Sequence, residues 1–323
     1  MFDKSIKKIY DGMFNFRCDD PGYNKYYTYQ EFDGMKEEKF SFVTRKNNTL
    51  RGGLYYSGGS IDEYEHMIVF LHGMTCGYLA YMNEINMLVK AGFLVLSYDY
   101  TATFSSDGDS LEGFGRPLVD FQDAMKAIEA DGRLNKKSIS LVGHSWGGYA
   151  AVNAVNMFDM FDCAVCLSPV LSYKAAIKQN FNGSFFGKLI SPHVMNYERK
   201  IFGDVIDLTG LATVEKPTPI LFVYSKDDPT VSYKYHYKPL EDIDDNPRHE
   251  RIVFEDRDHF PQFTKRAIEK FRKRQKEVRG WLAEGKTAEE INALSVDFCW
   301  DDIVEQDENL WARITQFISR NQK

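Results

Sequence analysis

The sequence predicts an α/β fold in which a mostly parallel central sheet is flanked by helices. Short apolar runs with the composition of buried strands recur along the chain, and segments with helical spacing separate them. One run, residues 138–142, passes directly into a helix-compatible segment, residues 146–155, through Gly-His-Ser-Trp-Gly. Because regular alternation of strand and helix needs crossover connections, it favours a parallel sheet.

The composition is that of an ordinary globular protein and excludes several classes. Hydrophobic residues make up 43% and charged residues 27%, and the net charge of −7 gives no reason to expect nucleic acid or an anionic membrane as a partner. No apolar run approaches the roughly 18 residues that span a bilayer, and the first residues lack the apolar region of a signal peptide. We therefore expect a cytoplasmic protein without stable membrane insertion.

The cysteines predict neither disulfides nor a metal site. They are five in number and scattered, which does not suit a disulfide framework. Cys163 and Cys166 form C-x-x-C within an apolar run, where a strand would point them to opposite faces. Joint metal binding by these two thiols is therefore not expected.

The first hundred residues begin the predicted sheet. Residues 1–39 form an aromatic-rich extension, which we expect to pack on the core or to reach over the active-site mouth. Residues 40–57 read as an antiparallel strand pair around an Asn-Asn turn, and residues 67–71 read as a parallel strand buried on both faces. A helix over residues 79–91, a strand over 93–99 and a helix over 117–130 follow, the last opening with proline at a favoured first-turn position.

The Gly143-His144-Ser145-Trp146-Gly147 stretch has the features of a sharp turn from strand to helix. Such a turn strains the backbone of its central residue, and neighbours without Cβ atoms let the two elements approach closely. The turn would hold the Ser145 hydroxyl at the carboxyl end of the strand. The amide of Trp146, at the helix N-terminus, would point to where a negative oxygen forms.

Beyond this turn the alternation breaks twice. A strand over residues 163–168 is followed by a long aromatic-rich interval, residues 170–217, before strands over 219–225 and 250–255 resume the pattern. Residues 261–300 form a second interval, with a basic helical segment and a capping box opened by Thr287 and closed by Glu290. The basic segment is interpreted as a solvated helix face, with steering of acidic substrates as the alternative. A final helix near the C-terminus has the spacing of one that packs on the sheet.

The stretches LHGMTCG and GHSWGG, with the chain order Ser145, Asp228, His259, resemble serine hydrolases of the α/β-hydrolase superfamily. The similarity is to the branch that holds carboxylesterases, monoacylglycerol-lipase-like enzymes and prolyl-peptidase-like hydrolases. It implies an α/β-hydrolase fold with a helical cap insertion. The core would comprise residues 40–169, 218–260 and 301–323, with residues 170–217 as the cap and residues 261–300 as a helical insertion.

The resemblance also implies roles for individual residues. Ser145 would be the nucleophile, His259 the base and Asp228 the acid, with the neighbouring Asp227 as the alternative acid. The amides of Met74 and Trp146 would form the oxyanion hole.

Two further histidine-related features follow from the comparison with the family. His72 would hold the loop after its strand and would not act as a base. Asp258 departs from the family pattern, which usually has glycine directly before the catalytic histidine, and a carboxylate there would raise the pKa of the imidazole.

The cap would help to choose the substrate through Phe185, Phe186 and Phe202, the alternative being a structural elaboration remote from the site. The predicted activity is hydrolysis of carboxylic esters with small or medium acyl groups, through an acyl-enzyme intermediate and without metal or organic cofactor. A serine aminopeptidase or acyl-peptide hydrolase is the first alternative. An acyltransferase and a non-catalytic ligand receptor on the same fold are the others, and the sequence leaves the oligomeric state open.

Overall fold

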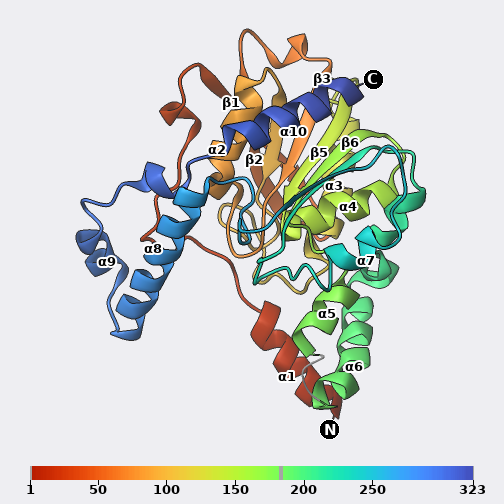
Figure 1. Ribbon diagram of the computed structural model, residues 1–323, viewed down its shortest axis with the longest axis vertical. Coiled ribbons are helices and arrows are strands. Elements are labelled where there is room, and N and C mark those ends of the chain that lie inside the picture. The colour runs from red at the N-terminus through yellow and green to blue at the C-terminus, as the bar shows by residue number, and fades with distance from the viewer. Residues whose placement is uncertain (1, 182–184, 323) are drawn as a thin grey trace.

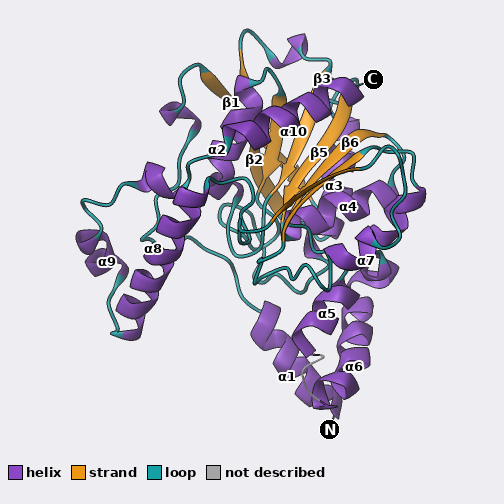
Figure 2. Ribbon diagram, in the orientation of Figure 1, coloured by secondary structure: helices purple, strands orange, loops and turns teal. Residues whose placement is uncertain are grey.

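The computed structural model describes residues 2–181 and 185–322, and these residues form one eight-stranded sheet covered by helices (Figures 1 and 2). The strand order is β1-β2-β4-β3-β5-β6-β7-β8. The pairs β1–β2 and β2–β4 are antiparallel, and all later pairs are parallel. The strands are β1 (Met35–Val43), β2 (Thr49–Ser57), β3 (His66–Leu71), β4 (Leu94–Tyr98), β5 (Ser138–His144), β6 (Phe161–Leu167), β7 (Ile220–Ser225) and β8 (Glu250–Phe254).

Helices cover both faces of the sheet, so each face buries its own apolar cluster. One cluster joins the sheet to α3 and α4, and the other joins it to α2 and α10, which lies across the strands in Figure 1. Cys163 belongs to the second cluster and Cys166 to the first, so the two thiols lie on opposite faces as predicted. The helices are α1 (Phe2–Phe14), α2 (Met82–Lys90), α3 (Arg116–Ala130), α4 (Trp146–Met157), α5 (Tyr173–Phe181), α6 (Phe185–Phe202), α7 (Tyr237–Glu241), α8 (Lys265–Ala283), α9 (Ala288–Leu294) and α10 (Glu308–Asn321).

The fold class predicted from the sequence is confirmed. The mostly parallel strands occupy the apolar runs, because such runs are buried on both faces only between two helical layers. Three boundaries differ. β1 begins at Met35, inside the segment expected to be the N-terminal extension, and β6 begins at Phe161 instead of residue 163. The segment expected to be a single helix over residues 79–91 opens with a 3-10 turn, Tyr78–Tyr81, before α2. The Asp99 carboxylate accepts the Tyr78 backbone N–H at 3.0 Å, which satisfies a donor at the start of that turn.

The N-terminal extension packs against the body of the protein. The backbones of Cys18 and residues 102–104 exchange hydrogen bonds, and the Arg17 guanidinium donates to the carbonyls of Phe104 and Ser106. Earlier in the sequence, the Tyr10 ring of α1 lies edge-on to the Tyr197 ring of α6, with 4.7 Å between the ring centroids. In Figure 1, α1, α5 and α6 accordingly extend together below the sheet.

The second interval forms a separate projection, which we name the α8–α9 arm (Figure 1). It is held together by a buried cation instead of a large apolar core. The Arg274 guanidinium lies over the rings of Trp281, Phe298 and Trp300 at 5.1, 4.8 and 5.4 Å, and it donates to Ser295. Cation–π contacts gain strength when the cation is desolvated, so this cage ties α8 to the chain that returns to the sheet. None of the described helices is long and apolar enough to cross a membrane.

A buried carboxyl group joins α6 to the core. Glu198 is fully buried, and its Oε1 accepts the backbone N–H of Gly115 at 2.7 Å, just before α3. Burial raises the pKa of Glu198 to about 8, although the hydrogen bonds from the Gly115 and Phe114 amides act to lower it. The group is therefore mostly neutral at pH 7, which removes the larger penalty of burying a charge.

This carboxyl group makes the stability of the wild type depend on pH. Since its folded-state pKa is raised from 4.5 to about 8, its contribution is complete below pH 4.5 and is lost as pH rises toward 8. Glu198→Gln keeps an oxygen for the Gly115 amide and removes the ionisation. We expect the free energy of unfolding of the variant, relative to wild type, to rise across this window by at most about 1.4 kcal/mol per pH unit.

Urea denaturation at several pH values between 4.5 and 8 measures this difference. Glu289→Gln, which removes an exposed carboxylate from α9, is the control for the loss of a carboxylate at the surface. Parallel curves for Glu198→Gln and wild type would show that Glu198 ionises normally in the folded protein.

Candidate active site

Ser145 lies at the turn between β5 and α4 in a strained backbone conformation, with φ 58° and ψ −113°. The turn is tight because glycines flank it. A Cβ on Gly147 would lie 1.9 Å from the carbonyl oxygen of Leu71 in β3, and one on Gly143 would lie 2.3 Å from the carbonyl oxygen of Gly147. The glycines predicted from the motif are thus required by backbone contact, and they let α4 start directly above the sheet.

His259 and Asp228 meet Ser145 at the carboxyl edge of the sheet. The Ser145 hydroxyl and His259 Nε2 are 2.8 Å apart, and His259 Nδ1 is 2.8 Å from Asp228 Oδ2. His259 is 6% exposed and Asp228 5%, so the pair is shielded from water. The three residues predicted from chain order therefore form one hydrogen-bonded line, although His259 comes from the loop after β8 and Asp228 from the turn after β7.

The two adjacent aspartates have different partners. Asp228 Oδ1 accepts the backbone N–H groups of Thr230 and Val231 at 2.8 Å each, which leaves Oδ2 for His259. Asp227 instead accepts the Ser225 hydroxyl at 2.5 Å and the Asp258 backbone N–H at 2.9 Å. Asp227 thus holds the loop that precedes His259, while Asp228 is bonded to the imidazole.

The residues expected to supply the oxyanion hole flank the serine. Trp146 is the first residue of α4, so its amide has no acceptor within the helix. The loop after β3 approaches from the other side, where a Cβ on Gly73 would lie 3.6 Å from Ser145 Cβ. His72 is fully buried, its Nδ1 lies 2.8 Å from the Gly73 carbonyl, and its Nε2 accepts the Tyr100 N–H at 3.3 Å. It holds this loop, and the role of the Met74 amide remains a prediction.

A hydrogen-bonded chain that the sequence analysis missed joins this loop to His259. The Gly73 N–H donates to the Tyr81 hydroxyl at 3.1 Å, and that hydroxyl is 2.8 Å from His144 Nδ1. His144 Nε2 is in turn 2.8 Å from the backbone carbonyl of His259. His144 occupies a variable position of the Gly-x-Ser-x-Gly motif, and its side chain points away from that of Ser145 because successive side chains alternate along a strand. No local pattern indicates Tyr81 as its partner.

The direction of this chain follows from chemistry. Burial first, and then the nearby His259, lower the pKa of His144 to about 3, so the ring is neutral at pH 7. The carbonyl of His259 can only accept, so His144 Nε2 carries the hydrogen and Nδ1 accepts from Tyr81. Every member of the chain is then satisfied, and the loop after β3, the serine turn and the histidine loop are bonded together.

The cap residues expected to bind substrate have a different status. The side chains of Phe185 and Phe186 lie outside the described residues. Phe202 is half-buried against the segment before α3, where its ring lies 5.1 Å from the Arg116 guanidinium. Its contact with substrate remains a prediction.

One residue of the 170–217 segment contacts the turn that carries Asp228. The side chain of Gln179 on α5 donates to the Thr230 carbonyl at 2.9 Å and accepts the Ser232 N–H at 3.0 Å. Since Thr230 also donates its N–H to Asp228, Gln179 braces the turn that carries the acid. The sequence offers no signal for this contact, because Gln179 lies in an ordinary helical segment.

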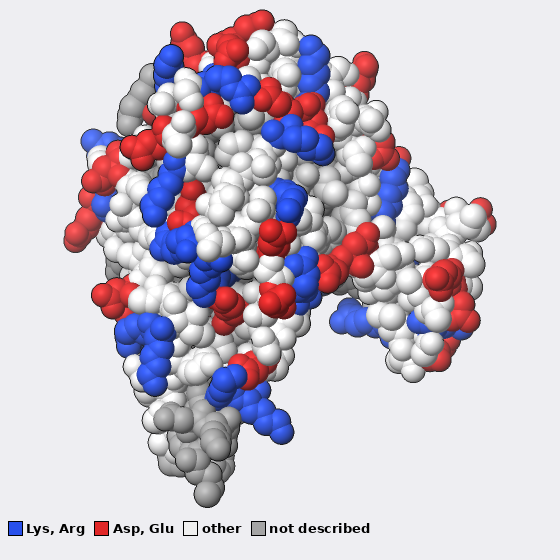
Figure 3. Space-filling view, turned by 180° about the vertical axis from the view of Figure 1, so that it is seen from behind, with Lys and Arg blue, Asp and Glu red and all other residues white. Residues whose placement is uncertain are grey.

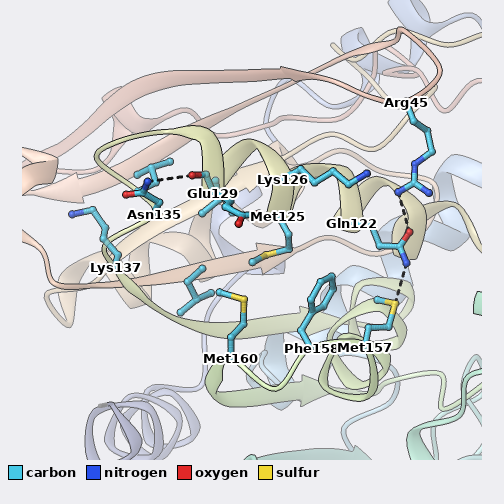
Figure 4. A pocket seen from close by; sticks show the side chains of 13 residues that line it. Arg45, Gln122, Met125, Lys126, Glu129, Asn135, Lys137, Met157, Phe158 and Met160 are labelled. Carbon is cyan, nitrogen blue, oxygen red and sulfur yellow. Dashed lines mark hydrogen bonds between the residues drawn. The ribbon is translucent and has the colours of Figure 1, made fainter.

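A cavity of about 690 Å³ lies beside the amino end of β5, and Figure 4 shows side chains that line it. It is lined by Met125, Met157, Phe158 and Met160 among others, and by Ile139 near the amino end of β5. Ser145 follows the carboxyl end of the same strand, about 20 Å away at the usual rise per residue. This cavity is therefore separate from the site around Ser145.

Comparison with known families identifies the chain. The profile of the prolyl oligopeptidase family matches residues 80–284, which is more than half of the sequence and includes Ser145, Asp228 and His259. The chain belongs to this family. It is accordingly a serine hydrolase with the α/β-hydrolase fold, as predicted. No curated protein sequence matches the chain.

Solved structures share the fold at low sequence identity. The esterase Pf2001 from Pyrococcus furiosus is 20% identical, with a TM-score of 0.57 over 84% of this chain and 98% of that one. The α/β hydrolase GrgF from a Penicillium species is 15% identical, with a TM-score of 0.57 over 89% and 99%. An acylaminoacyl peptidase from Pyrococcus horikoshii is 17% identical, with a TM-score of 0.52 over 71% of this chain and 39% of that one.

The Tyr81 hydroxyl provides a test of the hydrogen-bonded chain. Tyr81→Phe leaves the Gly73 N–H and His144 Nδ1 buried without their partner, so the loops on both sides of Ser145 lose a tie. We expect labelling by a fluorophosphonate probe to slow by about tenfold to hundredfold, because catalytic groups must be held in place.

Tyr78→Phe is the matched control. It removes a buried hydroxyl from the same 3-10 turn, but one that bonds Tyr55 instead of the loops around Ser145. Labelling rates and melting temperatures of both variants are compared. Equal slowing in the two would show that the Tyr81 hydroxyl contributes only to stability.

Proposed function

We propose that this protein hydrolyses carboxylic esters of small or medium acyl groups through an acyl-enzyme intermediate. The observation that carries the proposal is the continuous line from the Asp228 carboxylate through His259 to the Ser145 hydroxyl, with both contacts at 2.8 Å. A serine hydroxyl is a poor nucleophile at neutral pH unless a base takes its proton. This arrangement supplies that base.

In the proposed mechanism, Ser145 Oγ attacks the ester carbonyl while His259 Nε2 takes its proton. Asp228 holds the imidazole through Nδ1–H and stabilises its charged form. The amides of Trp146 and Met74 would stabilise the oxyanion, at about 3 kcal/mol per donor. His259 then returns the proton to the leaving alcohol, and water, activated by the same imidazole, releases the acid and regenerates Ser145.

Two features support esters as the first choice of substrate. The esterase Pf2001 aligns with this chain over nearly all of its own length. Esters are also cleaved more readily than amides by the groups assembled around Ser145, because an alcohol leaves more easily than an amine. The main alternative, cleavage of aminoacyl or acyl-peptide bonds, is favoured by membership of the prolyl oligopeptidase family and by likeness to an acylaminoacyl peptidase.

We further propose that residues 170–217 act as a cap over the site and contribute to acyl selectivity, with Phe202 and the phenylalanines at 185 and 186 among the residues involved. The support is positional. The cap leaves from the carboxyl end of β6, where the Val170 N–H donates to the Ser145 carbonyl at 3.3 Å, and ligands of such sheets bind beyond the carboxyl ends of the strands.

A cytoplasmic location is proposed as well, and the five unpaired cysteines support it.

The function is tested with a fluorophosphonate probe, p-nitrophenyl esters of graded chain length and aminoacyl anilides. We expect the wild type to be labelled and to turn over short and medium esters faster than anilides, and Ser145→Ala to lose both labelling and turnover. A preference for anilides would favour the peptidase, and transfer of the acyl group to an added alcohol would favour a transferase. If the folded wild type is not labelled, a non-catalytic ligand receptor would be the remaining alternative.

The acid is tested by comparing two neighbouring substitutions. Asp228→Asn places an amide against His259 Nδ1 and should lower kcat by about 10³-fold or more through loss of imidazole orientation. Asp227→Asn keeps an oxygen for the Ser225 hydroxyl and the Asp258 amide, so it should cost less than about tenfold. Steady-state ester hydrolysis by the two variants decides between the residues. A larger loss in Asp227→Asn would transfer the role to Asp227.

A further inference from the structure

The α8–α9 arm makes direct contact with the loop that carries His259. Figure 3 shows the arm as a projection separated from the lower part of the molecule by an open notch, so its base is where it meets the body. At that base, Phe271 lies edge-on to Phe260 at 4.9 Å, and the Arg272 guanidinium lies 5.8 Å from the same ring. Phe260 follows His259 and stacks on His144 at 5.4 Å. The arm therefore packs against the residues next to the imidazole.

Arg272 also holds the residue that precedes His259. Its Nε donates to Asp258 Oδ2 at 2.6 Å and its Nη2 donates to Oδ1, so the contact is bidentate. Asp258 Oδ1 in addition accepts the His259 backbone N–H at 2.5 Å. Planar, two-point contacts of this kind fix the orientation of both partners, so the position of Arg272 bears on the backbone of His259.

The backbone at Asp258 explains why such a clamp is needed. Its φ is 51°, in the left-handed region that glycine adopts freely and that other residues occupy at a cost. This is the position where related enzymes usually have glycine, so aspartate replaces a residue suited to the turn. Aspartate tolerates the region better than most residues, and its side chain is bonded on both oxygens here.

The charges at this position balance. Burial raises the pKa of Asp258, but the bonds from Arg272 and from the His259 amide outweigh burial and hold the pKa below its usual value. Asp258 is thus an anion beside the imidazole, and the Arg272 cation neutralises it. A lone carboxylate at this place would favour the charged imidazole, and the Arg272 cation opposes that effect.

We propose that Arg272 is a positioning residue for His259, acting through Asp258, and that the α8–α9 arm is thereby a working part of the active site. The proposal rests on the proposed role of His259 as the general base. It assigns a role to a segment whose basic sequence alone is interpreted as a solvated helix face, with steering of acidic substrates as the alternative. Other cations of α8 are engaged elsewhere: Lys265 pairs with Asp256, and Arg266 and Lys270 pair with Asp302.

Other charged or titratable groups around His259 come from several elements and stay the same in the variants below. Asp228 is bonded to the ring, His144 is buried and neutral, and Asp227 is bonded to the Asp258 backbone. Arg257 is directed to the Phe263 carbonyl and to Asp307. Changes in the pH dependence of the variants therefore report on the Asp258–Arg272 pair.

The experiment follows the acidic limb of kcat/KM for ester hydrolysis, which reports the pKa of the free base. Arg272→Gln leaves the Asp258 anion unpaired and should move the limb to higher pH by about 0.5 to 1 unit. Asp258→Gly suits the positive φ, leaves the cation alone, and should move the limb to lower pH by about the same amount. The double variant lacks both charges and should return the limb close to that of wild type.

Two controls separate charge from fold. Arg272→Lys keeps the cation but not the two-point contact, so the limb should stay near wild type while kcat falls by about threefold to tenfold. Lys273→Gln removes the same charge from the neighbouring, exposed position on α8 and should change neither quantity. Melting temperatures are recorded for every variant.

The outcomes distinguish the inference from the proposed function. A wild type that neither reacts with fluorophosphonate nor hydrolyses esters would overturn the proposed function itself. An active wild type whose limb stays in place in both Arg272→Gln and Asp258→Gly would overturn the inference alone. The inference would fail as well if both single variants moved the limb in one direction and the double variant moved it further, because unfolding and not charge would then explain the data.

Discussion

The close approach of β3, β5 and α4 around Ser145 is the constraint on which the rest of the site depends. A residue with a side chain keeps a positive φ only when its surroundings hold it there. Here the Ser145 N–H donates to Leu167 of β6 at 2.9 Å, and its carbonyl accepts from Tyr149 at 2.9 Å. Gly143 and Gly147 lack the Cβ atoms that would push the backbones apart. The strain is thus supported from both sides by regular structure, and the hydroxyl is fixed above the sheet.

The other two members of the line lie on loops, and loops need additional bonds to hold a side chain in place. Asp228 is held by two backbone amides of its own turn. His259 is held by Asp228 at its ring and by His144 at its carbonyl. Because His144 also receives a bond from Tyr81, the loop after β3 is tied to the same network. The strands therefore fix the position of Ser145, and a buried network of hydrogen bonds fixes the positions of His259 and Asp228.

Two long segments, residues 170–217 and 261–300, contact the site through such bonds as well as through apolar packing. Gln179 of α5 bonds the turn after β7, and Arg272 of the α8–α9 arm bonds the residue before His259. Both insertions leave the sheet at its carboxyl edge, where substrates of α/β folds bind. The cation cage around Arg274 serves the arm alone and holds it in shape.

The sequence by itself determined the fold class, the order of the strands along the chain, and the meeting of Ser145 with His259 and an aspartate after β7. The fold class and the turn at Ser145 follow from local physics, since apolar periodicity, turn chemistry and the glycine requirement of the elbow act over a few residues, whereas the resemblance to α/β-hydrolases implied the meeting of Ser145 with His259 and the aspartate. Only the tertiary structure showed which of the adjacent Asp227 and Asp228 is bonded to the imidazole, because that depends on which carboxylate the turn directs at His259. It alone paired Tyr81 with His144 and Arg272 with Asp258. Such pairs arise where separate elements pack together, and no local pattern encodes the distance between two side chains that belong to different elements.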